Sequence, residues 1–103
     1  FDAKGLEQGI IAAADRLAAA TEREMRLEDE RALVKDAAIR RLMAERQLSA
    51  TAAEKVVEAD VEYATHLAAK REAVVQRIKA RAYYEMWLVR ARIAIGNTEG
   101  VAA

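Results

Sequence analysis

The chain has 103 residues, which suits a single domain, and its 17 basic and 17 acidic residues give a net charge of zero, so there is no bulk electrostatic drive toward nucleic acid or an anionic membrane. It has no cysteine, which excludes a disulfide framework and a cysteine-ligated zinc site. Proline is also absent, 33% of the residues are charged and only 5% are aromatic, a composition typical of long helices or coiled coils.

The first predicted element is a helix over about residues 5–46. Two positions of its apolar seam are charged, Glu24 and Arg31, so the middle of the seam is narrow or holds polar pairs. The apolar positions recur mostly in alternating steps of four and three residues, as expected for a helix seam: Leu6, Ile10, Ala13, Leu17, Ala20, Leu27, Val34 and Ala38.

A corner is predicted at residues 47–51, within the stretch "RQLSATAAEK". Thr51 and Glu54 have the spacing of a capping box, in which each side chain accepts an amide at the start of a helix. This predicts that the second helical segment begins at about Ala52. A short connection between two long helices favours an antiparallel hairpin, and one continuous rod is the alternative.

The second helical segment is predicted over about residues 52–95. Asp60 is a second candidate cap, and it leaves two alternatives open: one continuous helix, or a short helix over about 52–59 followed by a long one over about 61–95. The stretch "GNTEGVAA", residues 96–103, is predicted to be a frayed tail.

The end of the second segment is apolar nearly all round, because eleven of the fourteen residues in "AYYEMWLVRARIAI", 82–95, are apolar. Such a helix needs cover on several sides, and the facing stretch 9–20 of the first helix is rich in small alanines. We therefore expect copies of the hairpin to associate into a helical bundle, with a dimer favoured. The expected oligomer interface is formed by Tyr83, Tyr84, Met86, Trp87 and Ile93.

No catalytic or metal-binding constellation is expected. The single histidine, His66, has no cysteine or second histidine to complete a nucleophilic or metal-ligating set, and no glycine-rich phosphate loop occurs. We therefore expect no enzymatic activity, no cofactor and no metal. The longest apolar run falls far short of the ~20 residues that a membrane helix needs, so no membrane partner is expected.

Nucleic acid is the main alternative partner. Residues 62–95 carry seven basic residues against three acidic ones, with aromatic residues among them. Arginines interleaved with aromatic rings can hold a single strand through phosphate contacts and base stacking. The candidate contact residues are Lys70, Arg77, Lys79 and Arg81.

Two stretches resemble small helical proteins encoded by tailed phages and prophages. The first, "SATAAEKVVEADVEYATHLAAKREAVV", holds an acidic-tyrosine-leucine run at Glu62, Tyr63 and Leu67; the second, "RARIAI", holds Ala91, Arg92 and Ile93. The resemblance covers about the last half of the chain. It implies an early, recombination-associated phage gene acting in the cytoplasm of a bacterial host, and no activity that can be assigned to a residue.

Taken together, the sequence predicts an all-α long antiparallel helical hairpin that assembles into a helical bundle. It is expected to serve as a non-enzymatic protein–protein assembly or adaptor module, a phage or prophage accessory protein whose protein partner the sequence does not identify. The first alternative is a nucleic-acid-binding accessory protein that uses the basic stretch 70–92. The second is a structural component of a phage particle.

Overall fold

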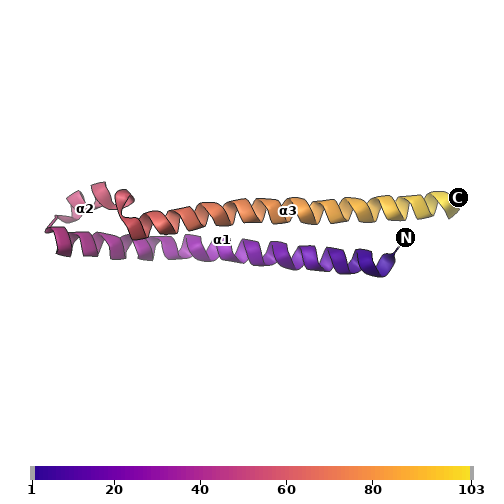
Figure 1. Ribbon diagram of the computed structural model, residues 1–103, viewed down its shortest axis with the longest axis horizontal. Coiled ribbons are helices and arrows are strands. Elements are labelled where there is room, and N and C mark those ends of the chain that lie inside the picture. The colour runs from indigo at the N-terminus through magenta and orange to yellow at the C-terminus, as the bar shows by residue number, and fades with distance from the viewer. Residues whose placement is uncertain (1, 103) are drawn as a thin grey trace. The chain divides into compact units, whose positions relative to one another are not determined.

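The computed structural model describes residues 2–102, and the side chains of residues 2–97. These residues form four elements and no strand: α1 (Ala3–Arg46), α2 (Ala50–Val56), the 3₁₀ turn η1 (Val57–Ala59) and α3 (Val61–Ala102) (Figure 1). Two long helices joined by a short helical connection confirm the predicted all-α hairpin. The chain divides into two compact units, which are described separately: residues 1–22 with 75–103 form unit 1, and residues 23–74 form unit 2.

The core of unit 2 lies where the connection packs against the two long helices. Val57 is the largest side chain that is fully buried, at 1% exposed, and every element of the unit contributes to the cluster around it. Because α2 and η1 both contribute, the connection is a packed part of the core rather than a loose loop. The cluster consists of Ala38 and Leu42 from α1, Ala53 from α2, Val57 from η1 and Tyr63 from α3.

α1 ends at Arg46 because Gln47 adopts a left-handed conformation, with a φ of 54°, which stops the helical path. Ser49 follows in an extended conformation, and its hydroxyl oxygen accepts the amide of Ala52 at 3.2 Å. The helix cap is therefore Ser49 and not Thr51, and α2 begins two residues before the expected start at Ala52. Both residues are good capping residues, and Ser49 takes the role because it is the one with extended backbone.

The start of α1 and the end of α3 also lie at other residues than the sequence predicts. α1 begins at Ala3, two residues early, because the Asp2 carboxylate accepts the amide of Gly5 at 3.1 Å and so caps the helix. α3 continues through Ala102, so the tail predicted to fray over 96–103 is helical as far as the described residues extend, and Ala103 lies outside them. α3 continues past Gly96, and no glycine in the described chain adopts the positive φ that often ends a helix.

Asp60 separates the connection from α3 and also ties α3 to α1. Its backbone is extended, with a ψ of 131°, and its carboxylate accepts the amide of Tyr63 at 3.1 Å. The same carboxylate accepts two hydrogen bonds from the Arg41 guanidinium, at 2.8 and 2.9 Å. Arg41 also forms an ion pair with Glu62, with a nitrogen–oxygen distance of 3.2 Å. Of the two alternatives that the sequence left open, the structure therefore has the broken form, with α3 starting at Val61.

This arrangement shifts the ionisation of Asp60. The hydrogen bonds from Arg41, followed by the amide of Tyr63, lower the pKa of Asp60 from 3.8 to about 2, and the carboxylate raises the pKa of Arg41 above its ordinary value. The Asp60 side chain is only 6% exposed, so the pair is better shielded from salt than an ion pair on the surface.

We predict that Ser49→Ala lowers the free energy of unfolding by about 1 kcal/mol, because the amide of Ala52 loses its acceptor. Thr51→Ala is the matched control, two residues away on the same turn, and should change it by less than about 0.5 kcal/mol. Urea unfolding of the two variants measures the difference. A larger loss from Thr51→Ala would restore the capping box that the sequence suggested.

We also predict an acid-sensitive contribution from Asp60. Its pKa is lower in the folded chain than in the unfolded one, so its stabilising contribution is complete above about pH 4 and disappears as the pH falls toward about 2. Asp60→Asn keeps a capping side chain but removes the charge. Its thermal midpoint should lie below that of the wild type at neutral pH, and the two midpoints should converge near pH 2. Parallel melting curves across this range would contradict the assignment.

Candidate interaction surface

In unit 1 the seam between α1 and α3 is lined by small residues. Ala13 of α1 and Ala80 of α3 are each 1% exposed, and they are the buried residues of this unit's described side chains. Contacts run in opposite directions along the two helices, because Gly9 meets Trp87 whereas Arg16 meets Tyr83. Small residues at an antiparallel seam let two helices approach closely and leave little space for large side chains between them.

Trp87 is a large aromatic side chain that packs into this seam. A Cβ atom added at Gly9 would overlap the indole, with the Cε3 atom of the ring only 2.7 Å away. The Tyr83 ring meets the indole edge-on, with centroids 6.4 Å apart, and the Arg90 guanidinium lies 5.2 Å above the indole. The indole N–H is buried and has no acceptor among the described residues. Trp87 is therefore engaged within the hairpin.

The side of α3 that faces away from α1 carries a stripe of exposed apolar residues, which no other part of the described chain covers. At 100° per residue, positions three or four apart share a face, and Ala82 lies 200° around the helix from the buried Ala80. The five large members are between 38% and 58% exposed. The stripe, which we name the outer α3 stripe, consists of Val75, Ile78, Ala82, Met86, Val89 and Ile93.

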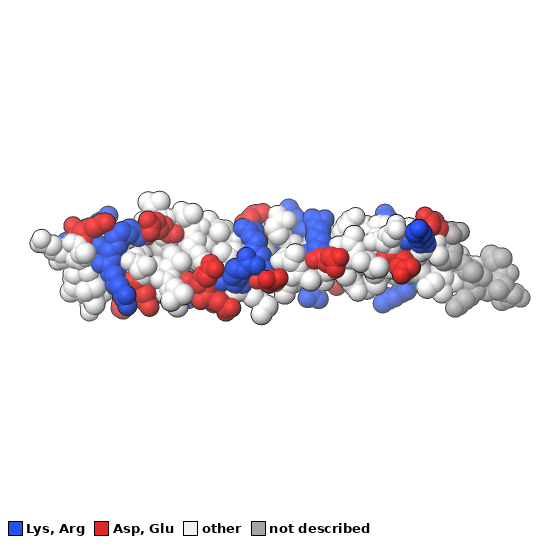
Figure 2. All heavy atoms as spheres, turned by 90° about the horizontal axis from the view of Figure 1, so that it is seen from below, with Lys and Arg blue, Asp and Glu red and all other residues white. Residues whose placement is uncertain are grey.

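The outer α3 stripe is bordered mainly by cations. Lys79 and Arg90 lie along one edge and Arg81 and Arg92 along the other, all four with exposed side chains, whereas Glu85 is the single carboxylate between residues 75 and 97. Figure 2 shows a face on which acidic and basic side chains are interspersed. An apolar stripe with charged borders has the pattern of a helix that docks against another helix.

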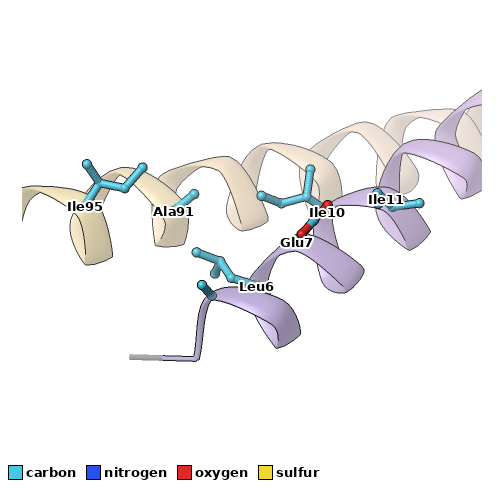
Figure 3. A pocket seen from close by; sticks show the side chains of 7 residues that line it. Leu6, Glu7, Ile10, Ile11, Ala91 and Ile95 are labelled. Atoms are coloured by element: carbon cyan, nitrogen blue, oxygen red, sulfur yellow. The ribbon is translucent and has the colours of Figure 1, made fainter.

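An open apolar groove of about 370 Å³ lies between the first turns of α1 and the last described turns of α3 (Figure 3). Glu7 is the one charged residue along it, so the groove does not bring together the polar groups that orient a small polar ligand. We attribute the groove to the small residues of the seam, which leave unfilled space beside larger ones. Its lining consists of Ala3, Leu6, Glu7, Ile10, Ile11, Ala91 and Ile95.

The five residues expected at an oligomer interface fall into separate positions. Met86 and Ile93 belong to the outer α3 stripe, and both are exposed. Trp87 faces α1, and Tyr84 is half-buried. Tyr83 is 39% exposed and its ring lies 5.3 Å from the guanidinium carbon of Arg16. Only Met86 and Ile93 are therefore placed together for contact with a partner, and the interface itself stays a prediction.

The four candidate nucleic-acid contacts are likewise not brought together as one patch. Lys70 belongs to unit 2, where its ammonium group forms an ion pair with Glu28, and this contact lowers the pKa of Glu28. Arg77 is half-buried and also has an interaction partner. Lys79 and Arg81 are exposed, on opposite edges of the outer α3 stripe. Nucleic-acid binding through these residues also stays a prediction.

His66 takes part in packing within unit 2. Its Nε2 donates to the backbone oxygen of Leu27 on α1 at 2.8 Å, so the ring is turned toward α1. Glu62, one turn earlier, contacts Arg41 instead. In the part of the chain that the structure describes, no three acidic or histidine side chains gather in a way that suits a metal ion. Nor does any helix there have the length and apolar character to cross a membrane.

No family model matches the chain, and no curated protein or solved structure shows significant similarity to it.

Sequence reasoning missed the role of Gly9, because a glycine near a helix start is an ordinary occurrence and its contact with Trp87 depends on the register of two distant segments. The outer α3 stripe did have a signal in the spacing of Val75, Ala82 and Ile93. A second apolar series adjoins it on the same helix, and spacing alone does not decide which series faces α1.

We predict that Gly9→Ala displaces the indole of Trp87, the only tryptophan. Overpacking costs about 1–3 kcal/mol, whereas alanine gains about 1 kcal/mol over glycine in a helix, so the net stability change is small or unfavourable. A red shift in tryptophan emission with easier quenching is the sharper readout. Gly96→Ala is the control: no atom lies within 4 Å of its added Cβ, so stability should rise with unchanged emission. Unaltered emission in Gly9→Ala would contradict the close contact.

Proposed function

We propose that this protein is a non-enzymatic assembly module that associates with other protein helices through the outer α3 stripe, with a second copy of itself as the favoured partner. One observation supports this proposal above all: five large apolar side chains are exposed on one face of α3, on the side away from α1. Scattered apolar residues are normal on a surface, but a continuous row along a single helix face indicates a contact surface.

The size of the row suits a helix as partner. Val75 and Ile93 are separated by five turns, roughly 27 Å along the helix axis. Burying one large apolar side chain contributes about 1.5–3 kcal/mol, so a few of them along such a contact are enough to offset the entropy cost of association. The stripe belongs to unit 1 alone, so the contact does not require any particular arrangement of the two units.

The resemblance of Glu62, Tyr63 and Leu67, and of Ala91, Arg92 and Ile93, to phage and prophage proteins supports an accessory role in a bacterial host cell, and we propose a cytoplasmic setting on the same basis. A structural part in a phage particle would use the same helix-to-helix contact. Neither setting requires a catalytic residue, which accords with the proposal of a non-enzymatic protein.

Nucleic-acid binding has weaker support. Lys79 and Arg81 are exposed, but the rings that would stack on bases are engaged: Trp87 with Gly9 and Arg90, and Tyr83 with Arg16. A single-strand site needs stacking rings beside its cations. The most exposed side chains of the outer α3 stripe, which lies beside Lys79 and Arg81, are instead aliphatic. Protein association is therefore the better-supported function.

We predict that the wild-type chain self-associates with rising concentration and that Met86→Glu with Ile93→Glu weakens this association at least about a hundredfold. Two large apolar contacts are lost and each 1.4 kcal/mol is a tenfold change. Sedimentation velocity over a range of concentrations measures it, with circular dichroism confirming helix content.

Leu33→Glu is the matched control for this experiment. Leu33 is a large apolar residue, 71% exposed, on α1 in unit 2, and its replacement should leave association unchanged. A wild-type chain that stays monomeric at all concentrations would overturn self-association. Equal impairment by Leu33→Glu would show that the stripe is not the specific surface.

A further inference from the structure

The outer α3 stripe needs a partner surface with matching properties, and unit 1 itself contains one on the other helix. This inference rests on the proposed function, namely association through the stripe. Five exposed residues of α1 repeat in steps of four, four, three and four, which places them on one helix face, and the first two of them, Glu7 and Ile11, also lie along the groove beside α3. We name this row the outer α1 face: Glu7, Ile11, Asp15, Ala18 and Glu22, all exposed.

The two outer surfaces of unit 1 are opposite in charge. Three of the five residues on the outer α1 face are carboxylates, and Lys4, one turn earlier, is the single cation on that side. The outer α3 stripe is bordered by Lys79, Arg81, Arg90 and Arg92, with Glu85 as the only carboxylate between residues 75 and 97 and Glu72 one turn before Val75. Opposite charges across an interface steer association and select its orientation, so the two surfaces attract one another.

The two surfaces also differ in their apolar side chains. The outer α3 stripe presents large residues such as Met86 and Ile93, whereas the outer α1 face presents Ala18 with Ile11 as its one large apolar member. Ala18 is the position on the outer α1 face where a large side chain can approach closely, as Trp87 approaches Gly9 at the seam. Two faces that both present large residues would be held further apart.

Pairing of two α3 stripes with each other is disfavoured by charge. It would bring the cations of one copy next to the same cations of the other, with only Glu85 from each copy to offset them. Like charges brought together at an interface cost free energy, whereas the outer α1 face supplies carboxylates at the same place.

We propose that the outer α3 stripe of one copy docks on the outer α1 face of a second copy. The two surfaces differ, so the contact is heterologous: every copy retains one unused surface of each kind, and addition of copies continues unless a ring closes. Such an arrangement makes the protein a head-to-tail assembler of hairpins rather than a two-fold dimer.

Two variants that each lose one surface test this proposal. Met86→Glu with Ile93→Glu removes the stripe and leaves the outer α1 face intact. Glu7→Lys with Asp15→Lys reverses the outer α1 face and leaves the stripe intact. Each variant alone should remain monomeric, and an equimolar mixture should form a complex of one copy of each that grows no further. Sedimentation velocity on the separate and mixed proteins measures this, with circular dichroism and Trp87 emission reporting that each is folded.

The outcomes separate this proposal from the proposed function. If the wild type associates and the variant changed at Glu7 and Asp15 does so equally well alone, the stripes pair with each other and only the head-to-tail arrangement is overturned. If the wild type never associates, the self-assembly function fails together with it. Monomeric wild type that binds a labelled single-stranded oligonucleotide, in a manner that Arg81→Glu abolishes and high salt weakens, would overturn both in favour of nucleic acid.

Raising the salt concentration adds an independent readout. Screening should weaken wild-type assembly by at least about tenfold between low and high ionic strength if the carboxylates of the outer α1 face meet the cations bordering the stripe. Assembly that strengthens with salt would mean that the contact is purely apolar or brings like charges together, and would overturn the charge pairing.

Discussion

The close approach of α1 and α3 in unit 1 limits which side chains of α3 can be fully buried within the hairpin. Ala13 of α1 and Ala80 of α3 are the buried residues among this unit's described side chains, whereas larger residues such as Tyr84 and Leu88 are half-buried. Gly9 makes room for Trp87. The five large residues of the outer α3 stripe are exposed on the side of α3 away from α1, where their burial is available to a partner.

Unit 2 uses its residues in the opposite way. Leu42, Val57 and Tyr63 are buried against the connection, and a carboxylate with a low pKa holds α1 to the start of α3 through Arg41. A geometry in which Asp60 both caps a helix and accepts two hydrogen bonds from a guanidinium is directional, so it specifies where the break in the chain falls. The apolar core supplies the stabilisation, and the polar contacts supply the specificity.

A net charge of zero conceals an uneven distribution within unit 1. Carboxylates such as Asp15 and Glu22 lie along the outward side of α1, and cations such as Arg81 and Arg92 lie along the borders of the outer α3 stripe. A net charge of zero gives the chain as a whole no general attraction for polyanions, while unit 1 carries surfaces of opposite charge. The association that we propose would be selective because it needs both the apolar row and the charge pattern beside it.

The sequence by itself determined the helical class, the hairpin and the surplus of apolar residues near the end of the chain, because composition and a period of 3–4 residues are local properties. It also held both capping signals at the corner, but Ser49 and Thr51 are chemically similar, and only the backbone conformation decided between them. The tertiary structure alone decided which apolar series of α3 faces α1. That choice depends on Gly9 lying opposite Trp87, a pairing between residues 78 positions apart that no local pattern encodes.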